Sequence, residues 1–272
     1  MPPAGVAVSA AARTMSWMRR LLAVSLLVLA LPVVAHAASN PIVAAAKRSA
    51  SAKSSTFEIR AATAIGGRAA SDVSGSGRQR GSAVGMSMTT RAGGKATNFD
   101  AVLLRERGAY VMYMRSPVLQ TQLPPGKSWW RLDLSKGAST LGIDFTSLMD
   151  ASQSLAPLEH GIVATKRIGN ETVAGRPTVH YSAVLDVKRA ARAVPAYGKQ
   201  VAALERATGI RLTRSTYHVW IGRDGRITRM RVATPTVIGS ARGTTVQTMT
   251  FLSYNVRITI AAPPAAQVVE AG

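Results

Sequence analysis

The chain has 272 residues and no cysteine, and its 34 lysines and arginines against 13 aspartates and glutamates give a formal net charge of +21 at pH 7. The lack of cysteine excludes disulfide bridges and a lipid anchor attached through cysteine. A positive charge of this size favours polyanionic partners. The basic residues are dispersed and the aromatic residues do not interleave with them, so we expect no nucleic-acid binding. A genome that prefers arginine is the alternative source of the charge.

The N-terminus shows the order of features of a secretory signal peptide. Arg19 and Arg20 precede the uncharged apolar run from Leu21 to Val34, and Ala35-His36-Ala37 places small residues at the two positions that a signal peptidase reads. The run is shorter than the about 20 apolar residues that a membrane-spanning helix needs. We therefore expect residues 1–37 to be a signal peptide cleaved after Ala37, with an uncleaved anchor as the alternative. Residues 38–272 are then expected to form a single domain.

Helical periodicity predicts three helices along the mature chain. The first covers Ala38 to Lys53, and the second covers Asp144 to Leu158, where apolar residues recur on one face. The third covers Lys188 to Thr208, with Gly209 at the position of a C-terminal cap. Pro195 lies inside the third helix, so we expect a kink there or a division into two pieces.

Alternation of apolar and polar residues predicts the strands. They are expected at Thr56–Arg60, Ala83–Thr90, Asn98–Arg105, Ala109–Arg115, Trp129–Leu134, Ile162–Ile168, Thr178–Val187, Thr216–Ile221, Arg226–Ala233 and Thr244–Tyr254. Arg107-Gly108, Ala174-Gly175 and Asp224-Gly225 indicate tight turns between strands. Ser71 to Gly81 is rich in glycine and serine, so we expect a loop or a flexible hairpin end. Many antiparallel-type strands with helical insertions indicate the α+β class.

Catalytic and metal-binding patterns are missing from the sequence. The four histidines are not at metal-ligand spacing, and there is no G-x-S-x-G nucleophile motif. Gly75-Ser76-Gly77 lacks the G-K-[ST] ending of a phosphate-binding loop. The carboxylates, Asp100 and Asp133 among them, are not brought together by their spacing. We expect no metal, no cofactor and no enzymatic activity, with a hydrolase of envelope polymers as the alternative.

Methionines are frequent in the predicted strands. Methionine side chains adapt to irregular apolar surfaces and are over-used where proteins bind varied apolar ligands, although each of them also suits an ordinary core. A curved sheet with helices on one face leaves room for an apolar cleft, the usual form of a ligand site. A shift of one residue in a strand would move its residues to the other face. The residues expected to line the cleft are Phe57, Met88, Leu104, Met112, Met114, Leu148, Tyr181, Trp220, Met230 and Phe251.

Three segments resemble a known family. Gly169 to Tyr181 (GNETVAGRPTVHY) resembles a hairpin of bacterial LppX/LprG-type lipoproteins, which belong with the LolA/LolB carriers and the RseB sensor in one superfamily. Trp129 to Leu134 (WWRLDL) is similar to a strand of that family, and His218 to Gly225 resembles its last large hairpin. The resemblance implies a LolA-like half-barrel, a strongly curved antiparallel sheet wrapped over helices. It also implies an apolar cavity for acyl chains and no catalysis.

The same resemblance implies a function. We expect an exported, non-enzymatic carrier that binds a lipid or lipidated molecule, touches anionic membrane surfaces transiently and moves its ligand within the cell envelope. An RseB-like sensor that acts through an envelope protein partner is the alternative. The chain departs from the LppX/LprG pattern at Ala37-Ala38, where those proteins have a lipid-anchored cysteine. We therefore expect a periplasmic or extracellular protein without a lipid anchor.

Overall fold

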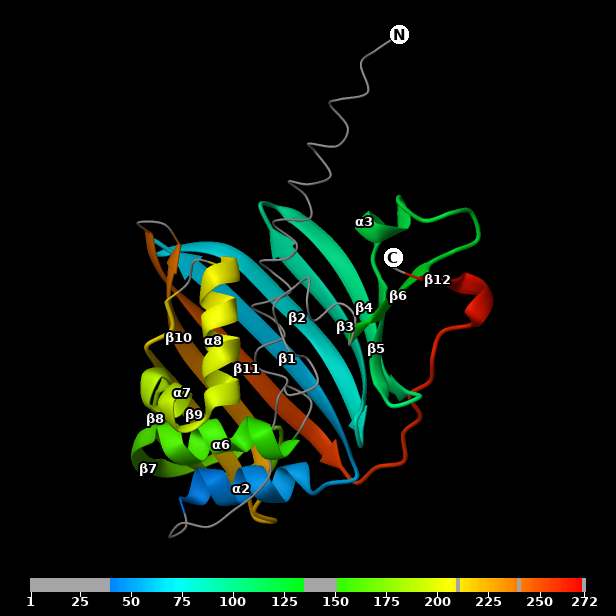
Figure 1. The fold of residues 1–272 in the computed structure, drawn as a ribbon. Helices are drawn as coiled ribbons and strands as arrows, with labels where there is room; N and C mark the ends of the chain where they lie inside the picture. Colours follow the sequence, from blue (N-terminus) through cyan, green and yellow to red (C-terminus); the bar gives the residue numbers. More distant parts are fainter. Residues whose placement is uncertain (1–39, 135–150, 209–210, 239–240, 271–272) are drawn as a thin grey trace.

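The computed structural model describes residues 40–134, 151–208, 211–238 and 241–270 (Figure 1). The expected signal peptide at residues 1–37, the first part of the second predicted helix with Leu148, and the predicted cap at Gly209 lie outside these residues. No described helix combines the length and the apolar composition that a membrane span requires.

Within the described residues, twelve strands form one open, strongly curved sheet in the order β12-β6-β5-β4-β3-β2-β1-β11-β10-β9-β8-β7 (Figure 1). All neighbouring pairs are antiparallel except β12 and β6, which are parallel. The expected α+β class and curved antiparallel sheet are confirmed. The strands are β1 (Ser54–Ile65), β2 (Arg68–Arg80), β3 (Ala83–Ala92), β4 (Lys95–Glu106), β5 (Ala109–Arg115), β6 (Trp129–Asp133), β7 (Ile162–Val173), β8 (Arg176–Asp186), β9 (Arg214–Gly222), β10 (Ile227–Ile238), β11 (Ala241–Tyr254) and β12 (Val268–Glu270).

Two of the longer helical segments begin at a capping side chain. The Asn40 side chain accepts a hydrogen bond from the Ile42 backbone at 3.0 Å, and Asp186 accepts one from the Arg189 backbone at 2.9 Å. The predicted division at Pro195 is confirmed, because α7 ends before it and α8 begins with it. The helices are α2 (Pro41–Ala50), α3 (Pro117–Gln120), α6 (Ala151–Gly161), α7 (Val187–Ala193), α8 (Pro195–Thr208) and the 3-10 helix η1 (Ala265–Gln267).

The hairpin turns follow the sequence signals. Arg107 and Gly108 have φ angles of 49° and 89°, and Ala174 and Gly175 have 49° and 73°. Positive φ at both central residues is the geometry of the two-residue turn that matches the twist of paired strands. The turns predicted at these two places are therefore confirmed.

The predicted loop at Ser71 to Gly81 is wrong, because β2 continues from Arg68 to Arg80 as a strand. The small residues have a packing role instead. A Cβ atom added at Gly77 would overlap the ring of Phe57, which is opposite in register on β1. Glycine in a strand often marks such a close approach, so the glycines that resemble a loop signal let the large side chain of β1 lie flat on the sheet.

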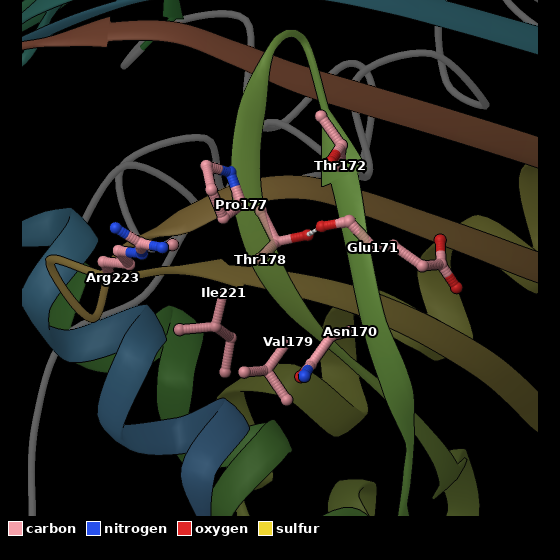
Figure 2. A pocket seen from close by; sticks show the side chains of 9 residues that line it. Asn170, Glu171, Thr172, Pro177, Thr178, Val179, Ile221 and Arg223 are labelled. Carbon is pink, nitrogen blue, oxygen red and sulfur yellow. Dashed lines mark hydrogen bonds between the residues drawn. The ribbon is translucent and has the colours of Figure 1, made fainter.

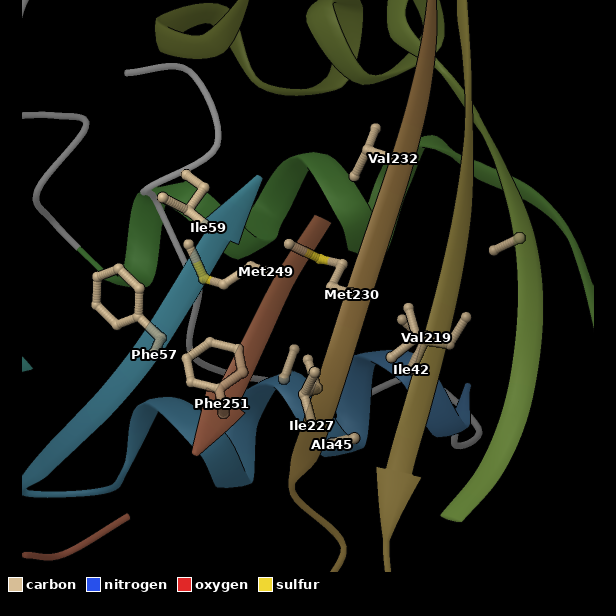
Figure 3. Packing of buried hydrophobic residues seen from close by; sticks show 12 residues of the cluster. Ile42, Ala45, Phe57, Ile59, Val219, Ile227, Met230, Val232, Met249 and Phe251 are labelled. Carbon is tan, nitrogen blue, oxygen red and sulfur yellow. The ribbon is translucent and has the colours of Figure 1, made fainter. Parts of the chain in front are cut away.

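The main core lies between α2 and the sheet. Ile42 and Ala45 of α2 pack on buried residues of β1, β9, β10 and β11, including Phe57, Met230 and Phe251 (Figure 3). In Figure 1, α2, α6 and α8 lie in front of the same part of the sheet. A second cluster joins Leu185 and Val187 of the β8–α7 connection to α8. The helices thus cover one end of the sheet.

Substitution of Gly77 tests this packing. We expect Gly77→Ala to lower the free energy of unfolding by about 1–3 kcal/mol, because the added methyl overpacks the Phe57 ring. Gly85→Ala on β3 is the matched control, since the nearest atom to its Cβ, Arg78 Nε, is at an ordinary 3.5 Å. Urea unfolding of both variants measures the difference. Equal effects of the two substitutions would contradict the proposed contact.

Candidate functional site

The strand register gathers apolar side chains on the face against which α2 packs, which we call the inner face. Side chains alternate between faces along a strand, so residues matched in register share a face. The first row across the inner face consists of Val219, Met230, Met249, Ile59, Gly75 and Met88. The second row consists of Phe251, Phe57, Gly77, Met86, Ala101 and Met114.

The two ends of these rows differ in whether helices cover them. The strand contacts of α2, α6 and α7 are concentrated on β7 to β10, where the row residues are buried. At the other end, Met86 and Met88 on β3 and Met114 on β5 are only half-buried. We call these three residues the methionine strip. Ala101 lies between Met86 and Met114 in register, and its small side chain leaves room for the two flexible thioethers to adjust.

Seven of the ten residues expected to line a cleft lie on the inner face. Met88, Met114 and Tyr181 are half-buried there, whereas Phe57, Met112, Met230 and Phe251 are buried in the core. Leu148 lies outside the described residues.

The expected inward orientation of Leu104 and Trp220 is wrong, because both side chains lie on the opposite, outer face. Each has apolar neighbours in sequence (Leu103, and Val219 with Ile221), so alternation does not decide which residue points inward.

An apolar patch on the outer face accounts for Leu104. Leu104 packs with the buried residues Val111, Tyr113 and Trp129 and with Val268 of β12. The sequence predicts no strand at 268–270, yet β12 pairs with β6, and Glu270 forms a salt bridge of 2.8 Å with Arg131. The C-terminal segment therefore covers this patch, and three residues are too few for a visible strand period.

Trp220 belongs to a hydrogen-bonded cluster on the outer face. Its indole Nε1 donates to Glu171 Oε2 at 2.7 Å, and Glu171 Oε1 lies 2.7 Å from His180 Nδ1. His180 Nε2 lies 2.9 Å from His218 Nδ1, and the His180 ring stacks on the indole at 4.2 Å between centroids. With His180 neutral and donating to Glu171, its Nε2 accepts the proton of His218 Nδ1.

The hydrogen bonds that join the four residues of this cluster are all made within the fold, and the cluster contains no serine, threonine or cysteine. Among the residues that the structure describes, no group of three or more histidines, cysteines or carboxylates is arranged to bind a metal ion. Sequence reasoning missed the cluster, because Glu171, His180 and His218 come from three strands whose register the sequence does not show.

A pocket of about 420 Å³ lies at the β7–β8 hairpin and the end of β9 (Figure 2). Its size is at the lower end for small-molecule sites. Figure 2 shows Val179 and Ile221 side by side and Thr178 bonded to the Glu171 carbonyl, at 2.8 Å. None of the ten expected residues lines it. The pocket is thus separate from the methionine strip on β3 and β5.

Comparisons with known proteins find distant similarities to solved structures. No protein-family model matches the chain, and a search of curated proteins finds no significant match. Among solved structures, the lipoprotein LppX of Mycobacterium tuberculosis is similar, with 11% identity, a TM-score of 0.44, and coverage of 81% of this chain and 96% of that one. LprF of Mycobacterium bovis is similar with 14% identity, a TM-score of 0.39, and coverage of 82% and 95%.

The MucA/MucB complex of Pseudomonas aeruginosa is also similar, with 16% identity, a TM-score of 0.28, and coverage of 80% of this chain and 56% of that one. LppX, the type of lipoprotein that the sequence segments resemble, and LprF are both among these similar structures. At these identities the likeness concerns the fold alone.

Because the hydrogen-bonded cluster around Trp220 contains two histidines, we expect the folding stability to depend on pH. Burial, with smaller contributions from His180 and Arg231, lowers the pKa of the His218 imidazole from its usual 6.5. The unfolded chain then binds a proton more readily than the folded one, so stability falls as the pH drops below about 6.5. The hydrogen bonds from Trp220 and His180 lower the pKa of the Glu171 carboxyl from its usual 4.5, so its contribution is lost only at still lower pH.

We expect His218→Gln to reduce the fall of the thermal midpoint between about pH 7.5 and about pH 5.5. Glutamine keeps a donor for His180 Nε2 and does not titrate in this range. Thermal unfolding followed by circular dichroism at several pH values measures the slope. Parallel pH profiles for the variant and the original protein would show that His218 does not couple to folding.

Proposed function

We propose that this protein is an exported, non-enzymatic carrier that binds the acyl chains of a lipid or lipidated molecule on the inner face of its sheet and moves them within the cell envelope. One observation carries the proposal, the half-buried methionine strip of Met86, Met88 and Met114. It continues, through the register of the sheet, into the buried core around Phe57 and Phe251. An apolar surface of this kind, exposed beside a core, is typical of a binding site.

The chemistry of the strip suits acyl chains. Its side chains are unbranched and polarisable, so they follow the shape of a flexible chain. Each methylene group that leaves water contributes about 0.8 kcal/mol, so that a chain of ordinary length can bind without any polar contact. Gly75 and Gly77 leave the inner face of β2, between the strip and β1, without side chains. Larger residues at these positions would collide with Met88 and Phe57.

The charge and the N-terminus support a place in the envelope. Without Arg13, Arg19 and Arg20 of residues 1–37, 31 lysines and arginines remain against 13 aspartates and glutamates, a net charge of +18. This charge attracts anionic membrane surfaces, at about 1 kcal/mol for each lysine or arginine that lies near the headgroups. The proposed signal peptide at residues 1–37 directs export. Since the chain has no cysteine, we propose that residues 38–272 act as a diffusing domain in the periplasm or outside the cell.

A charge placed on the methionine strip tests the proposal. We expect Met88→Arg to weaken binding of a fluorescent fatty acid by at least about tenfold, because a bound chain would bury the guanidinium. Ser87→Arg is the matched control. Ser87 is the preceding residue of the same strand, exposed on the outer face, so the same added charge leaves binding unchanged.

Native mass spectrometry of the protein purified from its own envelope fraction supplies the second measurement. We expect a lipid adduct on the original protein that is lost from Met88→Arg. The unfolding midpoints of Met88→Arg and Ser87→Arg are expected to equal that of the original protein. If the original protein carries no adduct and binds no fatty acid, the carrier proposal fails. A stoichiometric protein partner in place of lipid would then support the sensor.

A further inference from the structure

Gln247 on β11 is a buried amide without a visible purpose in the fold. Its side chain is on the inner face, the residue is only 4% exposed, and its Nε2 has no hydrogen-bond partner in the described part of the chain. Nearly all buried N–H groups in proteins are paired, so an exception calls for an explanation. Arg226 Nε shares this condition, but its guanidinium bonds Asp224 through Nη1 at 3.2 Å.

Gln247 lies at a boundary between apolar and hydroxyl-bearing positions. On one side, two residues along the strand, is Met249 of the first apolar row. On the other side is a row of hydroxyls, in which Ser215 bonds Thr234 at 3.3 Å and Thr63 bonds Thr245 at 3.2 Å. The inner face is therefore apolar through its middle and becomes polar at Gln247.

The flanking positions carry no charge. Val232 and Ala61 are the register neighbours of Gln247 on β10 and β1. An anionic headgroup buried here would lack a counter-charge, and burying an unpaired charge is costly. A carbonyl oxygen avoids this cost, because it is a strong acceptor without a charge.

We infer that Gln247 is a specificity-determining residue whose Nε2 donates a hydrogen bond to an uncharged carbonyl, ester or amide, carried by the bound acyl ligand. The inference rests on the proposed function. Three strand spacings, about 14 Å, separate β11 from β3, so one extended acyl chain reaches from the carbonyl at Gln247 to the methionine strip. The hydroxyl row beside Gln247 supplies further hydrogen-bonding groups for the part of the ligand beyond the carbonyl.

Three probes test the inference: methyl palmitate, N-methylpalmitamide and hexadecane. They share an apolar chain and differ in having an ester, an amide or no carbonyl. We expect the original protein to bind both carbonyl probes about five- to tenfold more tightly than hexadecane in a displacement assay. Gln247→Met is expected to remove this preference and leave hexadecane binding unchanged. Thr248→Met, which adds the same side chain to the outer face of β11, is the control and keeps the preference.

Thermal unfolding gives an independent readout. We expect Gln247→Met to raise the unfolding midpoint of the ligand-free protein, because the thioether has no amide to leave unpaired. A lowered midpoint, or a carbonyl preference that survives in Gln247→Met, would overturn the inference and leave the carrier proposal standing. If none of the three probes binds the original protein, the carrier proposal itself fails. An ester preference without an amide preference assigns the ligand to ester lipids, and the reverse assigns it to N-acylated molecules; both support the role of Gln247.

Discussion

A phenyl ring that lies against a glycine joins the helix-covered end of the sheet to the strands that carry the methionine strip. Phe57 on β1 packs with Phe251 of β11 at 6.2 Å between ring centroids, and on its other side it lies against Gly77 of β2. β1 is the strand where the helix-covered end of the sheet meets β2 and β3. The contact requires glycine on β2, and because register is continuous across the sheet, it also fixes which side chains of β3, β4 and β5 point inward. The position of the methionine strip is thus a consequence of packing two strands away.

The two faces of the sheet differ in how their apolar side chains are covered. The inner face is apolar through its middle. Helices cover it at one end, and the methionine strip lies half-buried at the other end. On the outer face, two apolar groups are each covered locally. Val268 of β12 packs on Trp129 and its neighbours, and His180 stacks on Trp220 while Glu171 holds the indole nitrogen. These two apolar groups of the outer face are therefore covered, whereas the side chains of the methionine strip remain half-buried.

Sequence patterns predicted α2, part of α6, the divided helix of α7 and α8, two of the hairpin turns and most strands, because these depend on local alternation, caps and turn residues. They failed where a contact between residues distant in sequence determines the element or the face to which a side chain points. Gly75 and Gly77 resemble a loop signal, but Met88 lies against the first and the Phe57 ring against the second. Leu104 and Trp220 point outward, although runs of apolar residues leave both faces open. In the candidate site, Met88 and Met114 could be chosen from alternation and residue type, and alternation also places Met86, two residues before Met88, on the same face, although it was not chosen.

Two features of the inner face reduce the stability of the ligand-free protein. The methionine strip leaves apolar surface partly in water, and Gln247 buries an amide nitrogen without an acceptor among the described residues. Without cysteine, the chain has no covalent cross-link to offset these costs, so the ladder of a large sheet and the helix-covered core must do so. Local conflicts of this kind tend to concentrate where a protein functions, because selection retains them there for a benefit other than stability. Both conflicts lie on the same face, one at each end of the span proposed for the acyl chain, and binding of the proposed ligand would resolve both.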